Sequence, residues 1–247
     1  MVSPVLRAVS GKMLCKIADL ITDVPAAGGL ASRCQPYIWE NAGEPDVVIR
    51  EDLYRPERYP NASPELVAYM ESAYQFYKEL VGFGGFYLHS SAVVVDGKAY
   101  IFSGFPGVGK STHTRNWQEI FGKDAAVIIN DDKPALRRID GVWYAYGTPW
   151  CGKDGINANE KAPVAGVCFL VKAEHNKIRR LSVWEAMQRV MSQTIYRFQS
   201  ADTLDRMLSH LEQFLQEVPV FEMENLPDLD AVRMSYSTMS REAGENI

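Results

Sequence analysis

Residues 104–111 read Gly104-Phe105-Pro106-Gly107-Val108-Gly109-Lys110-Ser111 and fill every fixed position of the motif Gly-x-x-x-x-Gly-Lys-Ser/Thr. An apolar, strand-like run (99–102) precedes the motif, and a predicted helix over 111–121 follows it. Glycines let backbone N–H groups curl around phosphate oxygens, and the helix N-terminus adds partial positive charge. We therefore predict that this loop binds the phosphates of a nucleoside triphosphate.

This prediction gives Lys110 and Ser111 of the loop specific roles. Lys110 neutralises the β- and γ-phosphates, and the hydroxyl of Ser111 is a ligand of Mg²⁺. The competing interpretation is a glycine-rich turn followed by a chance Lys-Ser, but the flanking strand and helix favour the nucleotide site. The predicted cofactors are ATP and Mg²⁺, and the predicted nucleotide-binding residues are Gly104, Phe105, Pro106, Gly107, Val108, Gly109, Lys110, Ser111 and Thr112.

A pair of acidic residues follows the next apolar strand. Asn130, Asp131 and Asp132 come directly after the β-branched run 125–129. Such a strand carries carboxylates to the metal beside the phosphates, and two adjacent acids allow one metal ligand and one base for an incoming hydroxyl. A solvated turn before Pro134 is the competing interpretation, and the upstream loop favours the functional one.

The strands around the loop predict a mixed sheet. The Asp96-Gly97 pair separates the apolar runs 92–95 and 99–102, and Asp140-Gly141 separates 135–139 from 142–146. Each is the pattern of a two-residue β-hairpin. Antiparallel pairing beside a phosphate loop is atypical of phosphate-loop enzymes, whose sheets are mainly parallel. We predict an α/β fold whose mixed, largely antiparallel-edged sheet surrounds the loop.

We expect one domain with three consecutive parts. Residues 1–80 contribute short strands, at 37–39 and 47–50, and a helix that Ser63 caps. Residues 81–172 form the nucleotide-binding core, and residues 173–247 supply C-terminal helices and, from about Ser237, a loose tail. The aromatic residues of the capped helix (Tyr69, Tyr74, Phe76 and Tyr77) are expected to pack in the core.

Composition excludes several classes of protein. The chain has 247 residues, with 26 Lys and Arg against 31 Asp and Glu, for a net charge of −5. Nucleic acid as the main partner requires a basic face, so this balance argues against it. The longest apolar run (164–171) is far shorter than the roughly 20 residues that span a bilayer. With no secretory signal evident and four scattered cysteines, we expect a cytoplasmic protein.

The segment Leu88-His89-Ser90-Ser91-Ala92-Val93, together with the hairpin, the loop and the acid pair, resembles the HPr kinase/phosphorylase family. It resembles the ATP-binding half of phosphoenolpyruvate carboxykinase more distantly. The resemblance implies that fold and an ATP- and Mg²⁺-dependent kinase that transfers the γ-phosphoryl group to a hydroxyl, most simply a serine of a protein or peptide. It implies that Asp131 deprotonates the acceptor, that Asp132 lies near the metal and that His89 is an active-site residue. Homo-oligomers are also expected by this resemblance.

The sequence departs from that family after the acid pair. Residues 147–159 stand where the family carries Leu-Glu-x-Arg-Gly-Leu-Gly-Ile, so HPr as substrate and a phosphorylase activity are not favoured. Lys153 and Asn157 in this glycine-rich segment are candidate substrate contacts, although a plain surface loop fits equally well. Residues 1–80 resemble the N-terminal region of HPr-kinase-like proteins from bacterial peptide-modification gene clusters. A small-molecule kinase and a non-catalytic nucleotide-binding scaffold remain alternatives, and the acceptor, the donor preference and the oligomeric state stay open.

Overall fold

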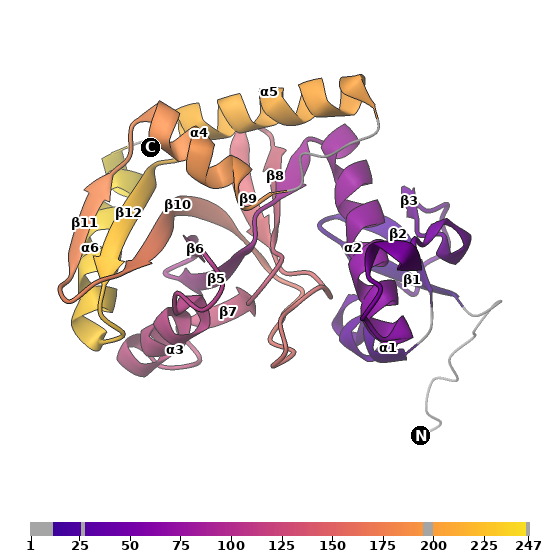
Figure 1. Cartoon of the computed structure of the whole chain (residues 1–247), viewed down its shortest axis with the longest axis horizontal. Coiled ribbons are helices and arrows are strands. Elements are labelled where there is room, and N and C mark those ends of the chain that lie inside the picture. The colour runs from indigo at the N-terminus through magenta and orange to yellow at the C-terminus, as the bar shows by residue number, and fades with distance from the viewer. Residues whose placement is uncertain (1–11, 26–27, 195–199, 246–247) are drawn as a thin grey trace.

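The computed structural model describes residues 12–25, 28–194 and 200–245 and is organised around a nine-stranded sheet (Figure 1). The strands lie in the order β4 (Gly85–Tyr87), β8 (Ala135–Ile139), β9 (Val142–Tyr146), β10 (Lys161–Lys172), β6 (Lys98–Ser103), β5 (Ser90–Val95) and β7 (Val127–Asn130). Two further strands extend this sheet, because β12 (Val220–Asn225) pairs with both β10 and β11 (Lys177–Arg180).

The long strand β10 joins the two halves of the sheet. Its first residues pair antiparallel with β9, its middle pairs parallel with β6, and its last residues pair parallel with β12. The pairs β5–β6, β5–β7 and β8–β9 are antiparallel. Figure 1 shows β10 as a curved strand across the middle of the molecule. The predicted mixed α/β sheet is confirmed at this level.

Both predicted hairpins are present, with turns that explain their sequences. Asp96 and Gly97 have φ angles of 52° and 72°, and Asp140 and Gly141 have 49° and 85°. Two successive positive φ angles define the tight turn that matches the twist of antiparallel strands, and Asp-Gly tolerates this conformation best.

Helices cover both faces of the sheet around β6. The residues of β6 alternate, so that Ala99 and Ile101 face one core while Tyr100 and Phe102 face the other. The first core is closed by α4 (Val183–Met191) and α5 (Ala201–Glu217), and the second by α3 (Lys110–Phe121) and α6 (Leu229–Glu245). Helix α3 packs against β6, the strand that precedes it in the sequence. The loop between β6 and α3 is therefore anchored at both ends.

The expectation of a loose C-terminal tail from about Ser237 is wrong, because α6 continues to Glu245. Its inner face carries Val232, Ser235 and Met239 at helical spacing, and all three are buried. Tyr236 adds ring contacts with Tyr100 and Trp117, at centroid distances of 5.8 and 5.7 Å. Polar composition concealed this helix, since its apolar residues are few but regularly spaced.

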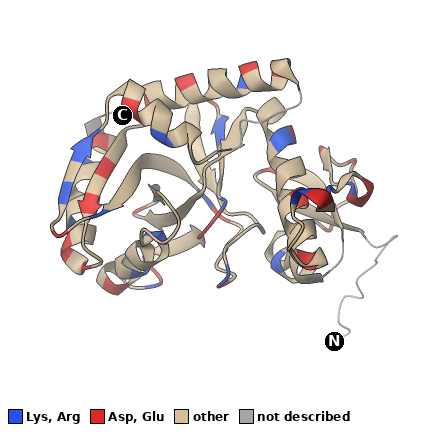
Figure 2. Ribbon diagram, viewed as in Figure 1, with Lys and Arg blue, Asp and Glu red and all other residues tan. Residues whose placement is uncertain are grey.

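The basic strand β11 lies next to acidic residues. Figure 2 shows the Lys and Arg residues of β11 beside the Asp and Glu residues of β12. Arg179 contacts Glu222 at 2.9 Å and Glu185 at 2.8 Å. Arg180 contacts Glu242 of α6. The two arginines of this strand are therefore paired with acidic residues of the protein itself.

The N-terminal part forms a second, three-stranded sheet of β1 (Lys12–Ile17), β2 (Leu20–Pro25) and β3 (Val47–Val48). The expected strand at 37–39 is wrong: that run lies at a 3₁₀ turn (Gln35–Tyr37) and contributes a single bridge from Ile38 to Cys15. Further 3₁₀ turns cover Glu51–Leu53, Pro56–Arg58 and Val81–Phe83. Two helices, α1 (Gly28–Arg33) and α2 (Pro64–Leu80), complete this part and share its core.

Helix α2 connects the two sheets. As predicted, the Ser63 hydroxyl caps it by accepting the backbone N–H of Leu66 over 3.3 Å. Phe76 and Tyr77 are buried as expected, whereas Leu66 in the first turn is 49% exposed. Over the residues that the structure describes, no helix combines the length and the apolar character needed to cross a membrane.

Candidate active site

The glycine loop spans residues 104–109, between the end of β6 and the start of α3, as the sequence predicts. Gly104, Gly107 and Gly109 have positive φ angles of 141°, 77° and 106°, which side chains rarely tolerate. A Cβ at Gly104 would also lie 2.9 Å from the carbonyl oxygen of Leu170. The loop conformation therefore requires glycines at these positions.

The polar groups of the loop converge at the start of α3. Lys110 Nζ donates a hydrogen bond to the Gly104 carbonyl oxygen over 3.0 Å, and burial lowers the pKa of Lys110 against the opposing effect of Asp132. Ser111 is half-buried and Thr112 exposed in the first turn of the helix. Among the other predicted nucleotide contacts, Pro106 and Gly107 are exposed, Val108 is half-buried, and the ring of Phe105 is 64% exposed.

The acid pair follows β7 in a turn that Asn130 holds. The Asn130 side-chain oxygen accepts the backbone N–H groups of Asp132 and Lys133 at 2.8 and 2.7 Å. Its amide nitrogen donates to the Thr148 carbonyl over 3.0 Å. Asn130 is fully buried, so this side chain fixes the direction in which the two carboxylates leave the strand.

Asp131 occupies the drier position of the pair. It is 8% exposed and accepts a hydrogen bond from the backbone N–H of Gly152. Burial raises the pKa of Asp131, and the negative charges of Asp132 and Asp154 add to this effect. A Cβ at position 152 would lie 2.8 Å from Asp131 Oδ2, so this approach requires glycine.

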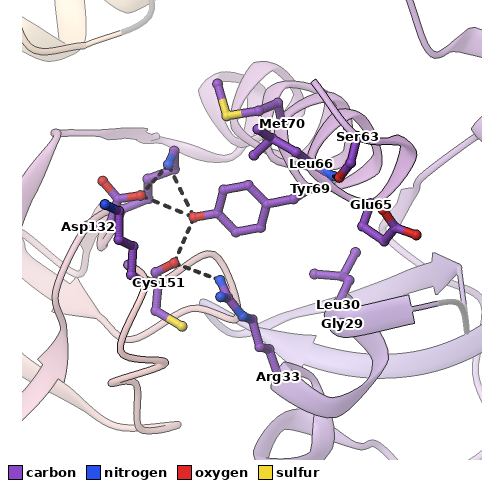
Figure 3. A pocket seen from close by; sticks show the side chains of 13 residues that line it. Gly29, Leu30, Arg33, Ser63, Glu65, Leu66, Tyr69, Met70, Asp132 and Cys151 are labelled. Carbon is purple, nitrogen blue, oxygen red and sulfur yellow. Dashed lines mark hydrogen bonds and ion pairs between the residues drawn. The ribbon is translucent and has the colours of Figure 1, made fainter. Parts of the chain in front are cut away.

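Asp132 lies among donors and cations (Figure 3). Tyr69 donates its hydroxyl to Asp132 Oδ2 over 3.1 Å, and Lys133 Nζ contacts the same oxygen. His89 Nε2 lies 3.3 Å from Oδ1. Burial alone would raise the pKa of Asp132, but Lys133, His89 and Tyr69 together hold it below the usual range. The two neighbouring acids therefore have pKa values that shift in opposite directions.

His89 is fixed by its backbone. Its N–H donates to the Gln193 carbonyl over 2.7 Å, and its carbonyl accepts the Ser103 hydroxyl over 2.8 Å. The structure thereby brings His89 beside Asp132, at the entrance of the glycine loop. Burial and the charge of Lys110 lower the pKa of His89, and Asp132 opposes this only in part.

Residues 147–159 return to the acid pair. A Cβ at Gly147 would lie 1.8 Å from the Ala158 carbonyl oxygen, so the two ends of the segment are in close contact. Asn157 pairs with Asn130 through a β-bridge, and its side chain donates to Cys151 Sγ over 3.4 Å. Lys153 is exposed and lines a pocket. Of the two candidate substrate contacts, Lys153 is thus placed beside an open space.

Three residues of the site were not identified from the sequence. Tyr69 was expected to pack in the core, but its hydroxyl reaches Asp132 and donates to the Cys151 carbonyl over 2.9 Å. Arg33 donates to that same carbonyl over 2.8 Å and lies over the Tyr69 ring at 5.2 Å. Lys133 lies over the ring at 4.8 Å. Only Lys133 carried a usable signal, because it directly follows the acid pair.

A pocket of about 580 Å³ opens beside Asp132, between α1, α2 and the 151–153 segment (Figure 3). Its polar end consists of Asp132, Lys133, Tyr69 and the Cys151 backbone. Its lining residues are Gly29, Leu30, Arg33, Ser63, Glu65, Leu66, Tyr69, Met70, Asp132, Lys133, Cys151, Gly152 and Lys153.

The remaining reactive side chains have structural surroundings. His113 Nε2 lies 3.1 Å from Ser235 Oγ, His210 Nε2 lies 2.9 Å from the Val81 carbonyl, and His175 pairs with Glu224 at 2.6 Å.

Burial raises the pKa of the Cys151 thiol, which disfavours a nucleophilic thiolate. Within the described ranges, no group of three or more His, Cys, Asp or Glu side chains is arranged to hold a metal ion.

Comparisons with known proteins found similarity among solved structures. No protein-family profile and no curated protein sequence matches this chain. Among solved structures, the Hpr(Ser) kinase/phosphatase from Coxiella burnetii is similar over 64% of this chain and 96% of its own, with a TM-score of 0.36 and 11% sequence identity. At this level of similarity, the function of the chain is judged on its own residues.

Proposed function

We propose that this protein is an ATP- and Mg²⁺-dependent kinase that phosphorylates a hydroxyl group, specifically a serine of a protein or peptide. The observation that carries the proposal is the convergence of a glycine loop, its lysine and an acid pair with opposed pKa shifts. The charge of Asp132 acts on both Lys110 and His89, so the loop and the acid pair share one electrostatic environment.

The opposed pKa shifts support different tasks for the two acids. A raised pKa makes Asp131 the better proton acceptor, whereas the lowered pKa of Asp132 keeps that carboxylate ionised. In the proposed reaction the acceptor oxygen attacks the γ-phosphorus, its proton passes to Asp131, and the bond to the β-phosphate oxygen breaks to release ADP. Lys110 and the backbone N–H groups of the loop stabilise the charge on the transferred phosphoryl group.

The residues present fit a magnesium ion that arrives with the nucleotide. Mg²⁺ commonly takes one or two protein oxygens and fills its other positions with phosphates and water. The Ser111 hydroxyl and the ionised Asp132 carboxylate would supply those protein oxygens, and Lys133 holds the carboxylate when no metal is bound. When bound, the ion would neutralise charge that develops on the phosphate oxygens.

The contrasting function is a nucleotide-binding scaffold without catalysis. Binding alone requires the loop and its lysine, but it gives no reason to bury a carboxylate against a glycine N–H. The position of Asp131 therefore favours catalysis over a scaffold.

Calorimetry with Mg·ATP tests the nucleotide site directly. Lys110→Ala should weaken the affinity at least tenfold, because the phosphates lose a fixed cation. Lys123→Ala removes an exposed lysine just beyond the same helix and serves as the matched control. Wild-type affinity in Lys110→Ala would show that the loop binds no triphosphate, and the proposed function would then be wrong.

A further inference from the structure

The pocket beside Asp132 is separate from the glycine loop, because none of its lining residues belongs to residues 104–112. It is built mainly by α1 and α2 of the N-terminal part, and it reaches the acid pair through Asp132 and Gly152. Gly152 of this lining donates its backbone N–H to Asp131, so a group bound in the pocket lies next to the residue that holds the proposed base. The N-terminal part thus adds a wall to the site that the nucleotide does not use.

The positively charged side chains of the pocket differ in whether a carboxylate pairs with them. Lys133 is paired with Asp132, whereas the Arg33 guanidinium contacts the Cys151 carbonyl and the Tyr69 ring, and no carboxylate within the described residues forms an ion pair with it. Lys153 is exposed at the same pocket. Glu65 is the other acid of the lining, and Figure 3 places it across the pocket from Asp132, next to Ser63. Within the part of the chain that the structure describes, Arg33 therefore offers a positive charge without an ion-pair partner close to the acid pair.

The other part of the pocket is apolar. Leu66 is 49% exposed and Met70 is half-exposed, and both residues of α2 line the pocket together with Leu30 of α1. An exposed leucine beside a half-exposed methionine gains stability when an apolar group covers it. The pocket thus combines an apolar wall with a cation, as a site for a short amphipathic segment would.

We propose that this pocket binds the acceptor peptide next to its serine. The inference rests on the proposed kinase function and adds the acceptor class: a segment in which an apolar side chain and a carboxylate flank the serine. The apolar side chain packs on Leu66 and Met70, and the carboxylate pairs with Arg33. This arrangement directs the serine hydroxyl toward the acid pair.

A positional peptide library tests the proposal with the full-length protein. Acetylated and amidated peptides with one central serine, and Asp, Lys, Leu or Ala at each flanking position, are incubated with Mg·ATP, and phosphorylation is measured by mass spectrometry. We expect Asp and Leu to be preferred over Lys at flanking positions. Arg33→Glu should lower kcat/KM for the best Asp-containing peptide at least tenfold and raise it for the matching Lys peptide, with Mg·ATP affinity unchanged.

Two control variants separate binding from a general loss of structure. Arg55→Glu reverses an exposed arginine outside the pocket, and Leu53→Asp matches Leu66→Asp at a leucine that is 43% exposed. Both controls should keep wild-type peptide preferences, while Leu66→Asp should lose the preference for Leu. Melting temperatures confirm that each variant is folded.

Several outcomes would overturn the inference. Arg33→Glu could leave the ranking of peptides unchanged, or it could slow all peptides equally, which would mean that Arg33 acts only through the Cys151 carbonyl. A wild-type protein that binds Mg·ATP but phosphorylates no peptide would also reject the acceptor site while leaving nucleotide binding in place. Absence of Mg·ATP binding would instead reject the proposed function itself.

Discussion

His89 Nε2 lies 3.3 Å from Asp132 Oδ1, at the point where β5 meets the turn after β7. The carboxylate favours a protonated imidazole, but burial and the charge of Lys110 outweigh it and lower the pKa of His89. Asp132 stays ionised because its own pKa is lowered. The lowered pKa of His89 favours a neutral imidazole beside the carboxylate, which suits an orienting group better than a cationic one.

The first prediction concerns His89→Gln, which keeps a polar side chain of similar reach without an imidazole. We expect this variant to fold normally, to bind Mg·ATP and to lose about a hundredfold in turnover, the scale of a catalytic group that is no longer held in position. Melting temperature and single-turnover rate should be measured on the same preparation. A lower melting temperature with an unchanged rate per folded molecule would assign His89 a structural role only.

The second prediction separates the two acids. Asp131→Asn should keep Mg·ATP affinity within about twofold and lower turnover at least a hundredfold, because a missing base affects the transition state rather than ground-state binding. Asp132→Asn should instead raise the Mg²⁺ concentration needed for half-maximal ATP binding. Calorimetry at several Mg²⁺ concentrations distinguishes the variants, and a collapse of ATP affinity in Asp131→Asn would make Asp131 the metal ligand.

The third prediction uses the close approach of Gly152 to Asp131. Gly152→Ala places a Cβ 2.8 Å from Asp131 Oδ2 and must displace the carboxylate or the 151–153 segment. Turnover should fall at least tenfold while Mg·ATP affinity stays unchanged, because the glycine loop is not involved. Gly82→Ala, where a Cβ meets nothing within 4 Å, is the matched control and should change neither quantity. If the two variants were equally active, the position of Asp131 would not matter for the reaction, and Asp131 would not be the base.

The parts of the fold that depend on local sequence were predictable. Asp-Gly turns fix hairpins through φ angles of adjacent residues, and the glycine loop is defined by its own spacing. The capping residue Ser63 likewise marks the start of α2, and its cap is present. These features need no knowledge of distant parts of the chain.

The parts that depend on tertiary contacts were not predictable. Tyr69 belongs to an aromatic stripe that periodicity assigns to the core. In the structure, however, its hydroxyl contacts Asp132, and both residues line the pocket. Arg33 lies 118 residues before its contact at Cys151 and has no motif around it. Helical periodicity identifies a buried face, but it does not reveal whether a core or an active site covers it.

The last prediction concerns the stability of the helix pair behind the glycine loop. His113 of α3 is 1% exposed, and its Nδ1 is buried without a hydrogen-bond partner among the described residues. Burial lowers the pKa of His113 to about 4 from the model-peptide value of 6.5. Between these two values the unfolded chain binds more protons than the folded one. The stabilising contribution is thus complete above pH 6.5 and is lost as the pH falls toward 4.

Replacing His113 by leucine removes this dependence. At pH 5 protonation of the unfolded state should cost the wild type about 2 kcal/mol of its free energy of unfolding relative to pH 7.5. His113→Leu should lack this part of the loss, and Ser235 keeps its hydrogen bond to the Val232 carbonyl in the variant. Urea unfolding at pH 7.5, 6 and 5 measures the difference between the two proteins, which cancels the contribution of other groups such as His89. If the two stability curves run parallel from pH 7.5 to 5, the imidazole of His113 is protonated equally in both states, and the buried, neutral histidine at the α3–α6 interface is excluded.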